Sequence, residues 1–135
     1  MLNRSLRFAP VVLVLALTLT AGCTGVQSSA SNATSAYTDL PVEEFKRMVD
    51  ESRAVPGETT ILDVRTSTEF ERERLRDAVN LDVSLGVFRD RIARFDHEKT
   101  FLVYDQSGPR SARAAQLLSE LGFAHVYTLR GGIAR

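Results

Sequence analysis

Short apolar runs alternate with longer amphipathic stretches through most of the chain. Runs with the length of buried β-strands lie at residues 60–64, 78–81, 101–104 and 125–128. Between them, apolar residues recur at helical spacing, which predicts helices over residues 41–51, 87–95 and 110–121. Ser67 or Thr68 is expected to cap a further short helix that reaches about Arg74. The alternation predicts a single α/β domain, in which a central parallel sheet carries helices on both faces.

The amino-terminal segment has a different pattern. Residues 8–19 are almost entirely apolar, and Arg4 and Arg7 precede them without any acidic residue. The stretch is shorter than a typical membrane span and has the length of the apolar region of an export signal. The sequence Leu-Thr-Ala-Gly-Cys, which ends at Cys23, is similar to the lipobox of bacterial lipoproteins. In those proteins the cysteine is lipidated and becomes the new amino terminus.

The segment after the cysteine is rich in Ser, Thr, Ala and Asn, a composition typical of a flexible tether. We therefore expect a lipoprotein-type signal peptide over residues 1–22, a tether over 23–36 and a folded domain over 37–135. Lipidated Cys23 would anchor the protein in the cell envelope after export, on the periplasmic or extracytoplasmic face of a membrane. The alternatives are an ordinary secretory leader with an incidental cysteine, and an anchor that is not cleaved.

Charge and composition argue against several classes of site. Without Arg4 and Arg7, the chain carries 15 basic against 17 acidic residues, a balance that gives no reason to expect nucleic-acid binding. Cys23 is the single cysteine, and His97 and His125 are far apart in the sequence. Neither a zinc site nor a disulfide framework is expected, and no metal or cofactor is predicted.

The candidate functional site is the segment FLVYDQSGPRS, residues 101–111, which reads as a strand, a polar loop and the start of a helix. In α/β folds, ligands bind at the carboxyl end of such a strand. The N–H groups of the loop and of the helix start would form a cradle for an anion. The candidate residues are Asp105, Gln106, Ser107, Gly108, Pro109, Arg110 and Ser111. Asp105 places a carboxylate where this cradle would receive negative charge.

Motifs along the folded part resemble those of the rhodanese family, whose members are α/β domains of sulfurtransferase type. Residues 61–70 are similar to the family motif LDVRxxxEF, residues 117–123 to LLxxLGF and residues 126–133 to VYxLxGGI. The resemblance implies a sulfane sulfur carried as a persulfide on a cysteine that opens the loop. In this sequence Asp105 stands at the cysteine position, and Gln106 stands where a basic residue is common.

Sulfurtransferase activity is not expected with an aspartate at this position. A carboxylate has no sulfur to extend, so it cannot hold a persulfide. Two unit charges about 4 Å apart repel by ~1 kcal/mol in water and by ~4 kcal/mol at an effective dielectric constant near 20, which disfavours thiosulfate. Asp105 is expected to cap the following helix or to pair with Arg110. Asp63 and Arg65 are supporting residues, and Arg65 is interpreted as a buried salt-bridge partner.

Three hypotheses follow for the function. The first is a lipid-anchored, catalytically degenerate rhodanese-like domain, a pseudoenzyme that binds an envelope protein or senses a cationic or neutral ligand. The second is an enzyme of altered chemistry, in which Asp105 is the nucleophile of a metal-dependent phosphatase with Asp63 or Arg110 assisting, or a residual sulfurtransferase-type activity. The third is a domain that only folds.

Overall fold

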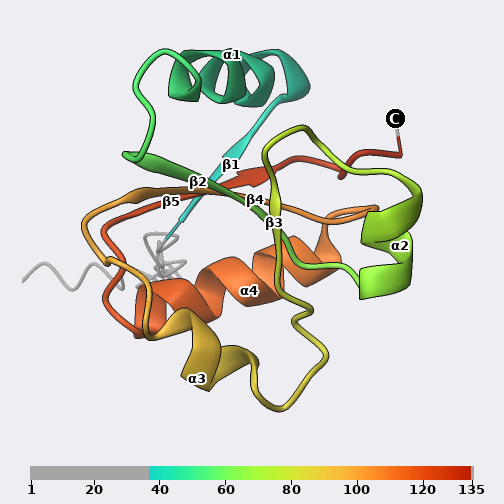
Figure 1. Ribbon diagram of the computed structural model, residues 1–135, viewed down its shortest axis with the longest axis vertical. Coiled ribbons are helices and arrows are strands. Elements are labelled where there is room, and N and C mark those ends of the chain that lie inside the picture. Colours follow the sequence, from blue (N-terminus) through green and yellow to red (C-terminus); the bar gives the residue numbers. More distant parts are fainter. Residues whose placement is uncertain (1–36, 135) are drawn as a thin grey trace, which may run out of the picture. The chain divides into compact units, whose positions relative to one another are not determined.

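The computed structural model describes residues 37–134 (Figure 1). Its elements alternate as predicted and run β1 (Thr38–Leu40), α1 (Val42–Ser52), β2 (Thr59–Asp63), α2 (Ser67–Arg72), β3 (Val79–Asn80), α3 (Phe88–Ile92), β4 (Thr100–Tyr104), α4 (Pro109–Glu120) and β5 (His125–Leu129). The predicted signal peptide, Cys23 and the tether lie outside the described residues. Within residues 37–134, no helix is long and apolar enough to cross a membrane.

All five strands form one parallel sheet in the order β1-β5-β4-β2-β3. The predicted parallel sheet is therefore confirmed. β2 and β4 are neighbours, with Asp63 paired opposite Tyr104 at their carboxyl ends. The residues that follow these two strands are thereby brought to the same edge of the sheet.

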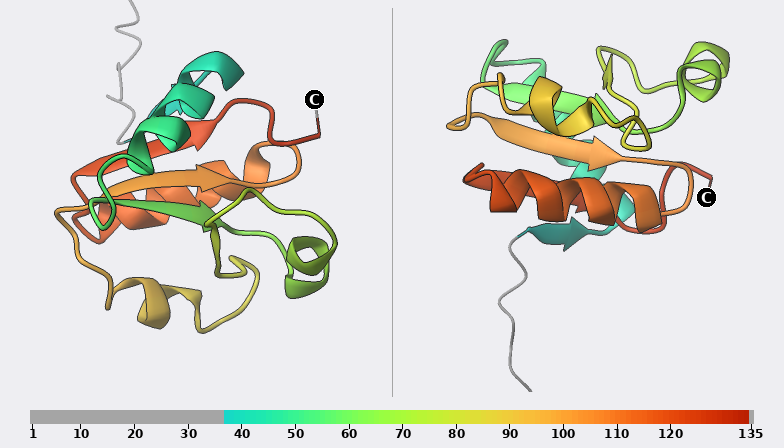
Figure 2. Two further views of the ribbon diagram at one scale, coloured as in Figure 1. Left: turned by 45° about the horizontal axis from the view of Figure 1, so that its top comes forward. Right: turned by 90° about the horizontal axis from the view of Figure 1, so that it is seen from below.

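Helices cover both faces of the sheet, as predicted (Figures 1 and 2). Successive residues of a strand point to opposite faces. In β4, Phe101 and Val103 pack into the core shared with α3 and α4, whereas Leu102 and Tyr104 pack into the core shared with α1. Both faces are buried, which explains why the strand sequences read as continuous apolar runs.

Two predictions for short elements were wrong. Thr66, not Ser67 or Thr68, caps α2, and the helix ends at Arg72. The Thr66 hydroxyl accepts a hydrogen bond from the Glu69 amide while the Glu69 carboxylate accepts one from the Thr66 amide, a capping box. α3 is also shorter than the predicted helix over residues 87–95. Phe95 lies after it and still packs against the core.

β1 was absent from the prediction. Its three residues, Thr-Asp-Leu, carry no strand periodicity, and the strand exists because β5 pairs with it at the edge of the sheet. Asp39 strengthens this pairing by accepting hydrogen bonds from the Thr128 hydroxyl at 2.9 Å and from Arg130 Nε at 2.9 Å. A tertiary contact thus creates the element.

Candidate functional site

Asp105 follows the last residue of β4 and its carboxylate is fully buried. Oδ1 accepts hydrogen bonds from the Gly108 amide at 2.8 Å and the Ser111 hydroxyl at 2.8 Å. Oδ2 accepts from the Arg110 amide at 3.2 Å, with the Ser107 amide at 3.5 Å. The carboxylate therefore occupies the ring of donors that the sequence predicted as an anion cradle.

The loop geometry follows from its glycine and proline. Gly108 adopts φ +115°, a conformation that favours glycine, and Pro109 begins α4, where an amide N–H is not needed for the helix. The Arg110 amide is one of the free donors at the start of α4, and Asp105 satisfies it. Gly108, not Asp105, is the N-cap residue of α4, but Asp105 does bind the start of this helix through the Arg110 amide.

Arg110 lies between two carboxylates. Its Nη1 and Nη2 donate to Glu69 Oε2 and Oε1 at 2.8 and 2.7 Å, and its Nε lies 3.7 Å from Asp105 Oδ2. The predicted Arg110–Asp105 pairing is thus present, beside a stronger bidentate pair with Glu69. The hydrogen bonds from Arg110, with those from Thr66, lower the pKa of Glu69 to about 2, and Glu69 raises the pKa of Arg110.

Asp63 and Arg65 form a buried ion pair on the other side of the loop. The Arg65 side chain is 2% exposed, and its Nη2 donates to Asp63 Oδ2 at 2.8 Å. Its Nη1 donates to Gln106 Oε1 at 3.1 Å, which fixes the first exposed side chain of the loop. The predicted buried salt bridge of Arg65 is confirmed, and the hydrogen bond to Asp63 raises the pKa of Arg65.

These pairings decide which neighbours are available to assist Asp105. Metal-dependent phosphatase chemistry needs further carboxylates that face the nucleophile. The carboxylates of Asp63 and Glu69 are instead each bound to an arginine. Among the described residues, no group of three or more His, Cys, Asp or Glu side chains is placed to hold a metal ion.

Two residues that sequence reasoning missed complete the site. Tyr104 accepts a hydrogen bond from the Leu75 amide at 3.1 Å, and burial together with the Asp63 carboxylate raises its pKa. Gly132 lies so close to the loop that a Cβ atom there would be 2.3 Å from the Gln106 carbonyl carbon. The paired glycines at 131–132 were the sequence signal for this approach, because only glycine lets two backbones come so near.

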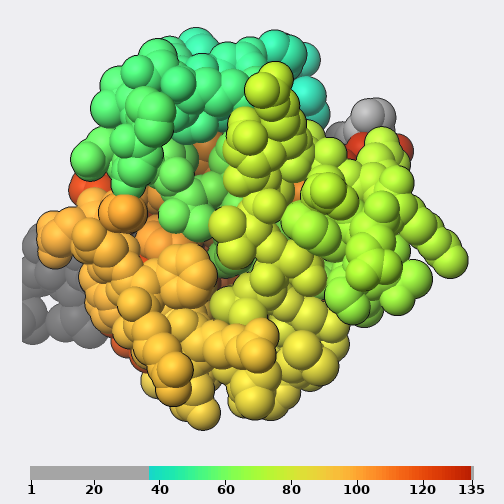
Figure 3. All heavy atoms as spheres, viewed as in Figure 1, coloured from blue at the N-terminus to red at the C-terminus, as the bar shows by residue number. Residues whose placement is uncertain are grey.

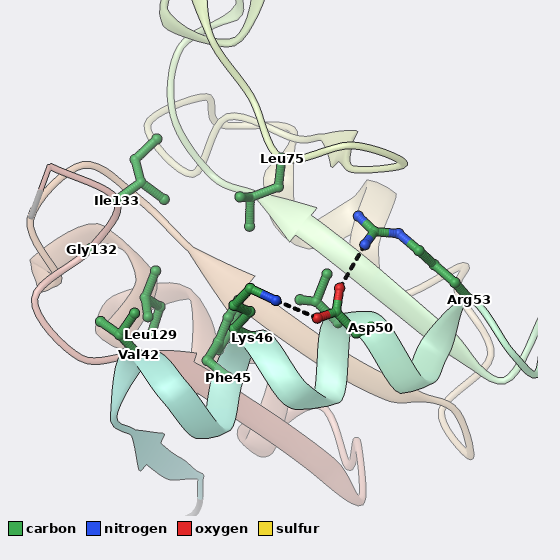
Figure 4. A pocket seen from close by; sticks show the side chains of 10 residues that line it. Val42, Phe45, Lys46, Asp50, Arg53, Leu75, Leu129, Gly132 and Ile133 are labelled. Atoms are coloured by element: carbon green, nitrogen blue, oxygen red, sulfur yellow. Dashed lines mark hydrogen bonds and ion pairs between the residues drawn. The ribbon is translucent and has the colours of Figure 1, made fainter.

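The segment after β5 also holds the loop from outside. The amide of Ile133 donates to the Asp105 carbonyl at 3.0 Å, and that of Ala134 donates to the Gln106 carbonyl at 3.2 Å. Ile133 and Gly132 then line an apolar groove of 340 Å³ beside α1, with Leu75 facing them (Figure 4). The Asp105 loop is therefore enclosed by β4, α4 and this segment.

A family model for the Rhodanese-like domain matches residues 41–135. The chain belongs to the rhodanese-like domain family. Among curated proteins, the chain is similar to a tRNA uridine(34) hydroxylase of Cytophaga hutchinsonii, at 36% identity over 71% of this chain and 30% of that protein. It is also similar to the thiosulfate sulfurtransferase GlpE of Coxiella burnetii, at 39% identity over 53% of this chain and 65% of that protein. The chain thus spans less than two thirds of the length of either relative.

Solved structures share the fold. A rhodanese-related protein from Thermoplasma volcanium superposes with a TM-score of 0.59 at 24% identity, over 71% of this chain and 86% of that one. The reduced CoADR-RHD of Bacillus anthracis gives a TM-score of 0.62 at 23% identity, over 75% of this chain and 16% of that one. These likenesses support the architecture of a rhodanese-like domain. What the site can do chemically has to be argued from the residues of the Asp105 loop.

Proposed function

We propose that this chain is a rhodanese-like domain that carries no sulfane sulfur and acts as a binding or regulatory module of the cell envelope. One observation carries the proposal: the Asp105 carboxylate accepts hydrogen bonds from the Gly108 and Arg110 amides and from the Ser111 hydroxyl. On the family resemblance, Asp105 stands where the cysteine of a sulfurtransferase would stand. The Asp105 carboxylate therefore takes up the hydrogen-bond donors that a bound anion would need.

The chemistry of the filled loop opposes sulfur transfer in two ways. A persulfide carrier needs a thiolate, and a carboxylate offers no sulfur on which the extra atom can be held. An incoming thiosulfate would also have to displace Asp105 from donors that it already holds, against the repulsion of like charges. Each 1.4 kcal/mol of that cost weakens binding about tenfold.

The direct test is a thiosulfate:cyanide sulfur-transfer assay on the purified full-length chain and on Asp105→Cys. Wild type is expected to show no turnover above the uncatalysed rate and no sulfur adduct by mass spectrometry. Asp105→Cys is expected to gain persulfide if the other loop residues still form the cradle. Turnover or a sulfur adduct in wild type would overturn the proposal, and Asp105→Ser controls for loss of the carboxylate alone.

A second assay on the same protein distinguishes the binding role from the alternative, an enzyme that depends on Asp105. Phosphatase screening with divalent cations is expected to show no rate that Asp105→Asn abolishes. A rate that falls in Asp105→Asn and stays in the exposed-site control Glu71→Gln would replace the binding role by altered catalysis.

The partner that we propose for the module is an envelope protein, so in vivo crosslinking is expected to capture a reproducible partner. Failure to recover one would favour a domain that only folds.

The location of the module is part of the proposal. Lipidation of Cys23 would keep the domain at a membrane surface, with residues 24–36 as tether. Mass spectrometry of the mature protein is expected to find the amino terminus at Cys23 with attached acyl chains, and Cys23→Ser is expected to move the protein from the membrane to the soluble fraction. An unmodified Cys23 in the mature protein would contradict the anchor and leave the proposal for the loop standing.

A further inference from the structure

β3 covers only part of the outer edge of β2. Its two residues pair with Leu62 and Asp63, and within the described residues no strand lies opposite Thr59–Ile61 on that side. The pairing is short because the chain turns before β3, at Asp77, which has φ +67°. The amino-terminal half of β2 is therefore an open sheet edge.

The direction of the backbone groups along this edge follows from the hydrogen bonds at both ends of β2. The Glu58 carbonyl and the Val64 amide bond to β4, at Thr100 and Tyr104, whereas the Asp63 carbonyl bonds to Leu81 on the β3 side. In a strand, successive residues direct their backbone groups to alternate sides. The N–H and C=O groups of Thr59 and the N–H of Ile61 consequently face the open edge.

These groups lie at the floor of a groove of 490 Å³. One wall is the turn after α1, which includes Pro56 and Gly57, and the other is formed by Arg76, Asp77 and Val79. Figure 3 shows this face hollowed between the green segment after α1 and the yellow-green segment that leads to β3. The groove thus runs along the strand edge and has room for a further backbone.

The side chains around the groove indicate what would enter it. Val79 on the far wall is 45% exposed and gives the groove an apolar side chain. Arg76 is 83% exposed and lies 3.7 Å from Asp77, which Arg53 also contacts at 3.3 Å. Arg53 is balanced by Asp50, at 2.8 Å, and by Asp77, so Arg76 is the cation of the groove that is most open to an incoming acidic side chain.

We propose that the open edge of β2 at Thr59–Ile61 binds an extended segment of a partner protein by strand addition. The segment would pair its backbone with Thr59 and Ile61, place a β-branched side chain against Val79 and direct an acidic side chain toward Arg76. The site lies at the amino end of β2, whereas Asp105 follows the carboxyl end of β4. The inference does not depend on the role proposed for the Asp105 loop.

A library of random octapeptides displayed on phage, panned against the full-length chain, supplies the probe. Enriched peptides are expected to alternate β-branched with other residues and to contain Asp or Glu. On binding, amide hydrogen exchange of Thr59 and Ile61 is expected to slow at least tenfold, with little change at Thr60, which faces β4. No enrichment above an unrelated control protein, or protection elsewhere on the domain, would overturn the proposal.

Two variants of Thr59 distinguish the contribution of its backbone N–H to peptide binding from that of its side chain. Thr59→Pro removes the edge-facing N–H and no bond to β4, so peptide affinity is expected to fall at least tenfold, whereas Thr59→Ala keeps it. Arg76→Glu is expected to weaken acidic peptides at least fivefold, while the exposed-site control Arg72→Glu does not. If Thr59→Pro does not fold, N-methylation of alternate peptide amides makes the same test on wild type. Equal binding by the methylated peptides would contradict strand addition.

Discussion

The guanidinium of Arg110 pairs with the carboxylate of Glu69 through both terminal nitrogens, at 2.8 and 2.7 Å, and joins the start of α4 to α2. The pair is about two thirds buried, and Glu69 also belongs to the capping box of α2. The Glu69 side chain thus links α2, its own helix, to α4, the helix that follows the Asp105 loop. The stability of the domain should respond to the charge of Glu69.

The pH dependence of this pair has a defined sign. The pKa of Glu69 is lowered to about 2 in the folded state, against roughly 4.3 for an unfolded glutamate. The pair therefore stabilises the fold above about pH 4.3, and its contribution is lost as the pH falls toward 2. Denaturant titrations of wild type and Glu69→Gln are expected to differ at pH 7 and to converge near pH 2. The exposed-site variant Glu71→Gln serves as control, and a difference that does not change with pH would contradict the assignment.

Asp105 is expected to contribute to stability because it satisfies buried donors of the loop. Asp105→Ala leaves the Gly108 and Arg110 amides without this acceptor, and we expect a loss of about 3 kcal/mol in the free energy of unfolding. Asp105→Asn keeps one acceptor oxygen and is expected to lose less. Urea denaturation measures both, and an unchanged stability of Asp105→Ala would show that water replaces the carboxylate without cost.

The buried Asp63–Arg65 pair gives a larger expected effect. Arg65→Met leaves a fully buried carboxylate without its cation, which typically costs about 3–5 kcal/mol. Adding Asp63→Asn removes the stranded charge, so the double variant is expected to recover part of the loss. The exposed-site control Arg72→Met is expected to stay within about 0.5 kcal/mol of wild type. A double variant less stable than Arg65→Met would contradict this account.

Gly132 is expected to tolerate no side chain. A Cβ atom would lie 2.3 Å from the Gln106 carbonyl carbon, and φ is +71°, so Gly132→Ala combines a backbone clash with a strained conformation. We expect a loss of about 2 kcal/mol or more and a shift of the amide resonances of Gln106 and Ser107. Gly86→Ala is the matched control, because nothing lies within 4 Å of a Cβ there. Resonances that stay in place in Gly132→Ala would contradict the tight contact.

The parts of the fold that sequence could predict are those that a continuous segment determines. The apolar periodicity of α4 and the buried runs of β2 and β4 identify these elements without tertiary information, since both follow from local spacing. β1 could not be found because pairing with β5 creates it. The cap of α2 was within reach: Thr66 and Glu69 have the spacing of a capping box, whereas the prediction chose the residues after Thr66.

The candidate site divides in the same way. The binding of Asp105 to the start of α4 was predictable because its donors lie within six residues of it. The bidentate partner of Arg110 is Glu69, and the partner of Gln106 is Arg65, each 41 residues away in sequence. Only the parallel pairing of β2 with β4 brings these segments together, so no local pattern announces such contacts.

Arg53 has a consequence for any ligand search on this domain. Its side chain links Asp50 of α1 to Asp77 and borders both hollows, the apolar one beside Ile133 and the one along β2. The Arg53 side chain is thus shared by the walls of two separate hollows. Replacing Arg53 with alanine is expected to join the two hollows into one longer groove. A compound that binds Arg53→Ala more tightly than wild type is then expected to occupy both hollows.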